Sequence, residues 1–192
     1  MKKNVFNSLM ALVVVFSMVS FAGNPIKEKQ VKVKQSEITW QGEKVTGFHE
    51  GTIALKDGFL IMEDGKLKGG EFVIDMTSIT VTDLSGENKG KLEGHLKSDD
   101  FFGVKNYPTA KMVIKSASKK NGNTYGVVGD LTIKGKTNPV TFNMEVEENE
   151  AEADIVIDRS KYDVRYGSGS FFDNLGDKTI YDNFELDVEL KF

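Results

Sequence analysis

The sequence predicts an all-β domain built as an antiparallel sandwich or barrel, and three observations support this fold class. Apolar and polar residues alternate with a period of two through most of the chain beyond residue 36, as they do in strands with one buried face. Turn-forming pairs such as Asp57-Gly58, Asp64-Gly65 and Gly135-Lys136 separate these stretches. Only segment 85–102 departs from the alternation. Without an internal repeat or linker, residues 36–192 are expected to form one domain.

The N-terminal region has the features of a secretory signal. Lys2 and Lys3 precede a long apolar run, and the small residues of Ser20–Ala22 offer a cleavage site. A membrane anchor is the alternative, because the run is close to spanning length. The abrupt change to polar sequence at Gly23 favours export, so we expect a signal peptide over residues 1–22 and a polar tail over residues 23–35.

Composition excludes several classes of function. The 192 residues carry a formal net charge of −4, which argues against nucleic acid or an anionic membrane as the main partner. The sequence contains no cysteine, which rules out disulfides, thiolate metal sites, a cysteine nucleophile and a lipid-modified N-terminal cysteine. We therefore expect an exported, disulfide-free domain.

The alternating stretches follow one another with turn signals every 8–15 residues or so, as in sheets of eight or more antiparallel strands. The segment that departs from them has Leu92 and Leu96 at helical spacing and a Glu93–Lys97 pair, so a short helix is expected there. The expected strands lie within residues 36–40, 48–55, 58–63, 69–81, 109–117, 124–133, 139–147, 151–159 and 180–192.

The inward faces of these strands are rich in methionine and aromatic residues. Such a set usually forms a packed core, but the flexibility of methionine also suits a cavity that adapts to an apolar guest. An eight-stranded barrel has room for either. Composition leaves the two readings open for the residues concerned: Phe72, Ile74, Met76, Met112, Ile114, Phe142 and Met144.

Two charged residues fall on inward faces. The 25 basic residues include only two arginines, and both lie within Ile157–Phe184. Strand parity directs Arg159 and Asp182 into the interior near strand ends, where an unpaired charge is very costly. We expect the two to approach one another, or to share a network with Asp158 and Asp163. Such a pair could close one end of a barrel or meet the polar head of a ligand.

Evidence for catalysis is thin. His49 and His95 have no second histidine at metal-ligand spacing, so no metal site is expected. The glycine-rich stretch 167–172 lacks the lysine and the spacing of a phosphate-binding loop. No nucleophile elbow is present, and the adjacent carboxylates of Asp99 and Asp100 fit a solvated loop. We expect neither an enzyme nor a cofactor.

Four stretches carry a family resemblance: "GGEFVIDMTSI", "KLEGHLKSDDFFGVKNYPTA", "GDLTIKGKTNPVTF" and "DRSKYDVRYGSGSFFDNLGDKTIYDNFELDVEL". In order and spacing the chain resembles the YceI-like family, in the variant common among Bacteroidetes-type bacteria, from about Ser36 to Phe192. Members are exported bacterial domains that bind polyisoprenoid and related lipids. The resemblance implies a lipocalin-like, eight-stranded antiparallel β-barrel with one short helix and an elongated apolar pore. It also implies one bound isoprenoid chain, no catalysis and a periplasmic or secreted location.

The resemblance also assigns roles to residues. It makes Phe72, Ile74 and Met76 pore-lining, and it implies that Phe101, Phe102, Tyr107, Phe171 and Phe172 flank the pore entrance. The full predicted lipid-binding set adds the other inward residues, Met112, Ile114, Phe142 and Met144, with Arg159 and Asp182 at the polar barrel end or against a head group.

Lacking a cysteine, the chain departs from lipid-anchored members, so we expect a soluble carrier with no stable membrane insertion after signal cleavage. A fatty acid, fatty amide or quinone is the alternative ligand, and a packed interaction domain without a ligand is the alternative class. A hydrolase is a third rival that nothing in the sequence favours. The assembly state, a homodimer included, stays open.

Overall fold

The computed structural model describes residues 28–192, and the predicted signal peptide lies outside them. Nine strands, one α-helix and two short 3-10 helices make up this part of the chain. The strands are β1 Glu28–Lys32, β2 Gln35–Lys44, β3 Gly47–Glu63, β4 Lys66–Val81, β5 Thr109–Lys119, β6 Thr124–Ile133, β7 Lys136–Val146, β8 Glu150–Asp158 and β9 Ile180–Lys191.

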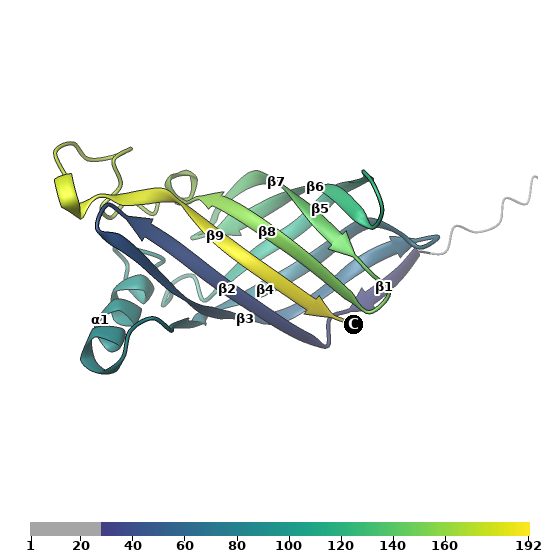
Figure 1. Ribbon diagram of the computed structural model, residues 1–192, viewed down its shortest axis with the longest axis horizontal. Coiled ribbons are helices and arrows are strands. Elements are labelled where there is room, and N and C mark those ends of the chain that lie inside the picture. The colour runs from purple at the N-terminus through teal and green to yellow at the C-terminus, as the bar shows by residue number, and fades with distance from the viewer. Residues whose placement is uncertain (1–27) are drawn as a thin grey trace, which may run out of the picture.

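The sheet closes on itself into an antiparallel barrel (Figure 1). Its hydrogen-bonded order is β1-β3-β2-β9-β8-β7-β6-β5-β4, and β4 pairs back onto β3. The long β3 pairs with β2 through Gly47–Thr52 and with β1 through Phe59–Glu63, so β1 and β2 together occupy one of eight positions around the barrel. The expected eight-stranded, lipocalin-like barrel is therefore confirmed.

The structure differs from the sequence prediction at two places along this first part of the chain. Glu28–Lys32, within the expected polar tail, forms β1. Asp57-Gly58, expected to be a turn between two strands, lies inside the continuous β3, where the register with β4 shifts between Leu55 and Asp57. The pair thus marks a β-bulge, which bends a strand without reversing it.

The pair Asp64-Gly65 does form the expected hairpin turn, between β3 and β4. Both residues have positive φ, 49° and 73°, which is the backbone of the tight hairpin turn that asparagine, aspartate and glycine favour. The turn therefore agrees with the local chemistry of the sequence.

The expected helix is α1, Gly86–Lys97, between β4 and β5. Leu96 is buried and Leu92 packs against the same core. The side chain of Glu93 accepts a hydrogen bond from the backbone N–H of Val81 at 3.0 Å and lies 3.7 Å from Lys89, rather than pairing with Lys97 as expected. This bond fastens the weak, glycine-containing helix to the end of β4.

Two ends of the barrel can be distinguished (Figure 1). The helix end consists of α1, segment 98–108, the β2–β3 and β6–β7 turns and the connection from β8 to β9. The far end carries the β3–β4, β5–β6 and β7–β8 turns. The connection from β8 to β9 begins with the 3-10 helix η1, Arg159–Tyr162, and contains a second, η2, Gly176–Lys178.

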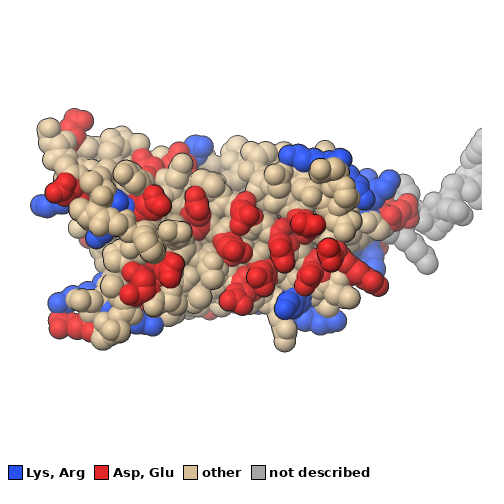
Figure 2. All heavy atoms as spheres, viewed as in Figure 1, with Lys and Arg blue, Asp and Glu red and all other residues tan. Residues whose placement is uncertain are grey.

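The outer wall of the barrel is strongly acidic over neighbouring strands. Register aligns Glu37 of β2, Glu189 of β9, Glu152 of β8 and Glu145 of β7 in one row, and all four side chains are exposed. Figure 2 shows acidic side chains spread over this face. We call this surface the acidic wall. The other face of the same strands points inward, as the alternation predicts.

Candidate binding cavity

The barrel encloses an apolar cavity of about 170 Å³. It is lined by inward side chains from all strands except β1, together with residues of α1 and of the segment that follows the helix. Arg159 is the only charged residue among those that line it. An interior of this kind can hold an apolar molecule by burial of its surface, without directional bonds.

Most of the residues predicted to bind lipid lie around this cavity. Ile114 is buried but does not contact it; this residue pairs with Gly70 and Gly129 and belongs to the packed core. Eight predicted residues line the cavity: Phe72, Ile74, Met76, Phe101, Phe102, Met112, Phe142 and Met144.

Several lining residues were absent from the predicted set. They lie on β2, β3 and β9, and also on β4, β5, β6, β8 and α1. For those on strands, the period-two alternation of the sequence is the signal that points inward. The missed residues include Ile38, Trp40, Ile53, Leu55, Phe184, Leu186 and Val188.

A glycine makes room for the single tryptophan. Gly51 pairs with Trp40 across β2 and β3, and a Cβ built on Gly51 would lie 2.6 Å from the indole ring and 1.9 Å from the carbonyl oxygen of Thr80. The indole Nε1 donates to the carbonyl of Thr52 at 3.3 Å. The ring thus lies over backbone that carries no side chain, beside the cavity.

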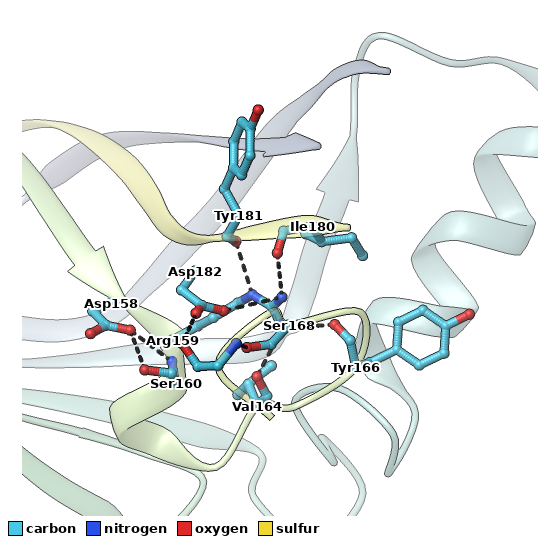
Figure 3. Close-up of polar contacts among 10 residues, drawn as sticks. Asp158, Arg159, Ser160, Val164, Tyr166, Ser168, Ile180, Tyr181 and Asp182 are labelled. Carbon is cyan, nitrogen blue, oxygen red and sulfur yellow. Dashed lines mark hydrogen bonds and ion pairs between the residues drawn. The ribbon is translucent and has the colours of Figure 1, made fainter. Parts of the chain in front are cut away.

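Arg159 is buried at the helix end and holds the connection from β8 to β9 against the start of β9 (Figure 3). Its Nη1 donates to the carbonyls of Val164 and Tyr166 at 2.8 and 2.9 Å. Its Nε and Nη2 donate to the carbonyls of Tyr181 and Ile180 at 3.1 and 2.9 Å. Four of the five N–H donors of the guanidinium are therefore used by backbone oxygens.

The expected approach of Arg159 to Asp182 is present, with Nη2 and Oδ1 3.5 Å apart. The other carboxylate oxygen of Asp182 accepts a bond from Ser170 at 2.6 Å. Asp158 and Asp163 do not share this network, because the first caps Ser160 and the second pairs with Arg165.

Burial lowers the pKa of the Arg159 guanidinium, while Asp182 and Asp158 act in the opposite direction. Arginine nonetheless stays protonated in proteins, so the site keeps its charge. The guanidinium also lies 5.4 Å from the ring of Phe101, a cation–π contact that links it to the cavity lining.

Besides Oδ1 of Asp182, which has only the ion-pair contact with Arg159, two further side-chain polar groups are buried without a hydrogen-bond partner among residues 28–192. The hydroxyl of Tyr162, in η1, is one, and burial raises the pKa of this residue to about 12. Nε2 of His95 is the other; its ring lies between those of Phe101 and Tyr166, with centroids 5.6 and 4.3 Å away.

Three predicted entrance residues lie at the helix end but do not line the cavity. Tyr107 packs beside Gly135 of the β6–β7 turn and is 39% exposed. Phe171 and Phe172, in the connection before β9, are 39% and 50% exposed, and Arg165 lies over the ring of Phe171 at 4.9 Å.

No group of three or more histidine, aspartate, glutamate or cysteine side chains in residues 28–192 is arranged to hold a metal ion. Within the same residues, no helix has both the length and the apolar character needed to cross a membrane.

Fold and cavity together define a class: closed antiparallel barrels that surround an apolar interior. The particular family follows from comparison with known proteins. The chain belongs to the YceI-like family, since the model of the YceI-like domain matches residues 29–192.

Sequence relatives are UPF0312 proteins. One from Pseudomonas putida is 34% identical over 95 residues, which cover 50% of this chain and 47% of the relative. One from Staphylococcus aureus is 31% identical over 121 residues, covering 57% of this chain and 67% of the relative. The chain thus matches about half the length of the Pseudomonas protein.

Solved structures share the fold at low sequence identity. BcnA of Burkholderia cenocepacia has a TM-score of 0.64 at 23% identity, over 81% of this chain and 94% of that one. A polyisoprenoid binding domain from Saccharophagus degradans has a TM-score of 0.59 at 14% identity, over 85% and 97% of the two chains. These likenesses establish the fold.

Proposed function

We propose that this protein is an exported carrier that binds or sequesters a long isoprenoid-type lipid in its barrel, without catalysis. The observation that carries the proposal is the cavity of about 170 Å³, whose lining is apolar except for Arg159. Family membership and the fold shared with a polyisoprenoid binding domain support the same reading. The signal-like first 22 residues support a periplasmic or secreted location.

Hydrogen bonding at Arg159 favours an uncharged chain over a fatty acid. A carboxylate brought into an apolar interior needs donors to replace its water. Among residues 28–192, Arg159 is the only cation that lines the cavity, and its N–H groups are directed to four carbonyls and to Asp182. A carboxylate head would have to break these hydrogen bonds, whereas an isoprenoid tail can bind while they stay intact.

Cavity size sets a condition on the ligand. A cavity of roughly 150 Å³ holds benzene, so 170 Å³ accommodates only a short apolar segment without movement of the walls. The three methionines among the lining residues, Met76, Met112 and Met144, have flexible side chains that can change rotamer to lengthen the cavity. We therefore expect a long chain to bind by displacing these side chains.

Mass spectrometry tests the proposal directly. The protein is purified after expression with its own leader, and its mass is measured under native conditions and again after organic extraction. We expect loss of the first 22 residues and a stoichiometric apolar adduct of isoprenoid mass. An adduct of fatty-acid or quinone mass would show that the ligand belongs to that class and is not an isoprenoid. A protein that is empty and takes up neither added isoprenoid nor fatty acid would favour the packed interaction domain.

A matched pair of substitutions separates a cavity from a filled core. Ala110 lines the cavity and Ala153 faces inward without lining it, and both are about equally buried, at 5% and 6% exposure. Ala110→Leu should leave stability nearly unchanged and weaken uptake of a long isoprenoid. Ala153→Leu should cost about 1–3 kcal/mol of unfolding free energy by overpacking. Equal destabilisation by the two would show that the space around Ala110 is not available to a ligand.

A further inference from the structure

Exposed apolar side chains are concentrated at one end of the barrel. Nine large apolar residues are exposed among residues 28–192, and only Val128 and Val156 lie on the side of the barrel. The remaining seven belong to the helix end: Val45, Phe48, Tyr107, Tyr166, Phe171, Phe172 and Tyr181.

Six of these seven lie on the β2–β3 turn, the adjoining end of β3, the start of β9 and the connection before it. The β2–β3 turn carries Val45, and its N–H donates to the carbonyl of Thr179 in the connection before β9 at 3.1 Å. Phe48 of β3 pairs with Glu43 of β2, the strand that also pairs with β9, so Phe48 and Tyr181 share the outer rim. The surface, called here the aromatic rim, comprises Val45, Phe48, Tyr166, Phe171, Phe172 and Tyr181.

The backbone fixes the two adjacent phenylalanines of the aromatic rim in their exposed position. The N–H groups of Phe171 and Phe172 both donate to the carbonyl of Ser168, a residue with no exposed surface, at 3.2 and 3.1 Å. Ser170 is in turn bonded to Asp182 of β9. Because the turn is anchored at both sides, the two rings are presented to solvent by an ordered structure.

The aromatic rim adjoins the cavity. Tyr181 and its neighbour Ile180 are among the residues that line the cavity, as is Arg159, which bonds the carbonyls of both. In Figure 3 the ring of Tyr181 points away from Arg159, towards the outside. A lipid that passes over this rim therefore has an apolar path from the outer surface to the cavity.

Charge favours contact through this end rather than through the side. The acidic wall presents a row of glutamates across four strands, whereas the segments of the aromatic rim contain both signs, with Lys44, Arg165 and Lys178 close in sequence to acidic residues. Phenylalanine and tyrosine on projecting turns are the residues that enter the boundary between headgroups and acyl chains.

We propose that the aromatic rim is a membrane-docking surface, which inserts into the headgroup layer of a lipid bilayer while the cavity takes up or delivers a lipid. This inference rests on the proposed lipid-binding function. Since the rim carries charges of both signs, the interaction depends on apolar insertion and only weakly on anionic lipid or salt.

Vesicle flotation tests the inference with the exported form of the protein. The vesicles consist of phosphatidylcholine alone, or of phosphatidylcholine mixed with phosphatidylglycerol, at low and high salt. The test variant is Phe171→Ser combined with Phe172→Ser. Val128→Ser combined with Val156→Ser is the matched control, because it removes equally exposed apolar side chains from the side of the barrel. Uptake of a short isoprenoid alcohol added without vesicles is measured in parallel.

We expect the original chain and the control to float with both kinds of vesicle, and the test variant to bind about tenfold less or weaker still. Uptake of the isoprenoid alcohol should be the same for the original chain and the control. If the original chain takes up the alcohol but never floats with vesicles, docking is overturned while the lipid-binding proposal stands. If it does neither, the proposed function itself fails. If the test variant instead converts a dimer into a monomer in solution, the rim is an interface between two copies and the docking proposal is wrong.

Discussion

Replacement of Arg159 by methionine decides whether this residue is structural or a ligand contact. The substitution keeps an unbranched side chain but removes the donors to four backbone carbonyls, which include those of Val164 and Tyr166. It also leaves Asp182 without its cation. At roughly 1–1.5 kcal/mol for each lost bond, the expected loss of unfolding free energy is about 4–6 kcal/mol. This range overlaps the cost of breaking a buried ion pair.

Urea denaturation measures this loss. For a domain of this size we take an m-value of about 2 kcal/mol/M, so the unfolding midpoint should fall by roughly 2–3 M. The midpoint of Arg159→Lys should lie between those of the original chain and of Arg159→Met, because ammonium keeps the charge but has three donors in a different geometry. Arg165→Met is the control; its side chain is 58% exposed, and the midpoint should hardly change.

A small change in the urea midpoint would contradict a structural role for Arg159. A midpoint for Arg159→Met within about 0.5 M of the original chain would mean that the four carbonyls are satisfied without the guanidinium. If the same variant then loses affinity for lipid, Arg159 serves the ligand rather than the fold. We expect the opposite pattern: lower stability, with isoprenoid uptake preserved wherever the variant is folded.

Three further predictions concern stability. Tyr162→Phe should raise the unfolding free energy by about 1 kcal/mol, because a buried hydroxyl without a partner in residues 28–192 is removed. The phenol of Tyr162 has a pKa near 10 in the unfolded chain and of about 12 in the folded one. Between these pH values the unfolding free energy of the original chain should therefore fall by about 1.4 kcal/mol per pH unit. Urea titrations at alkaline pH should show that slope for the original chain and not for the variant. Gly51→Ala should lower the melting temperature severely, since its Cβ would lie 1.9 Å from a carbonyl oxygen of β4. Gly42→Ala is the control and should hardly change the melting temperature, because no atom lies within 4 Å of its Cβ. Equal effects of the two substitutions would contradict the steric argument. Glu93→Ala should cost about 1–3 kcal/mol by orphaning the N–H of Val81, and Glu93→Gln should recover most of it; no difference between the two would show that water replaces the carboxylate.

Period-two alternation predicted the last two strands well. In β9 every even residue from Ile180 to Leu190 is at least half-buried and every odd residue is exposed. The same parity directed Arg159 and Asp182 inward, where the structure has them. A strand with one buried face cannot shift by a residue without turning that whole face to water, so its sequence records its orientation.

The course of β3 could not be predicted in the same way. Asp57-Gly58 and Asp64-Gly65 have the same local chemistry, yet only the second reverses the chain. What distinguishes them is pairing with β4, which is non-local, and a bulge uses the same residues as a turn. Glu93 shows the same limit, because its partner is the N–H of Val81, twelve residues earlier, rather than the next turn of its helix.

For the site, the sequence predicted which side chains face the barrel interior, but it predicted neither the cavity volume nor the hydrogen bonds of Arg159. Phe142 and Ile114 are both inward, and only the first lines the cavity, because strand tilt and neighbouring residues determine where space remains. Two of the four carbonyls around Arg159, those of Val164 and Tyr166, belong to a connection without regular structure, so no periodicity specifies them. The predicted charge pair was correct in its members, while most of its bonds were unforeseen.

Because of the acidic wall, the stability of this barrel should depend on ionic strength. Glu152 faces Glu189 and Asp154 faces Asp187 across β8 and β9, and like charges directly opposite one another destabilise a sheet. Desolvation, followed by the repulsion from Glu189 and other nearby carboxylates, raises the pKa of Glu152. Salt screens such repulsion, so the barrel should gain resistance to heat as salt is added, the reverse of a protein that depends on surface ion pairs. Two copies that meet wall to wall repel one another as well, which keeps concentrated protein dispersed while its aromatic rim remains free to meet a partner.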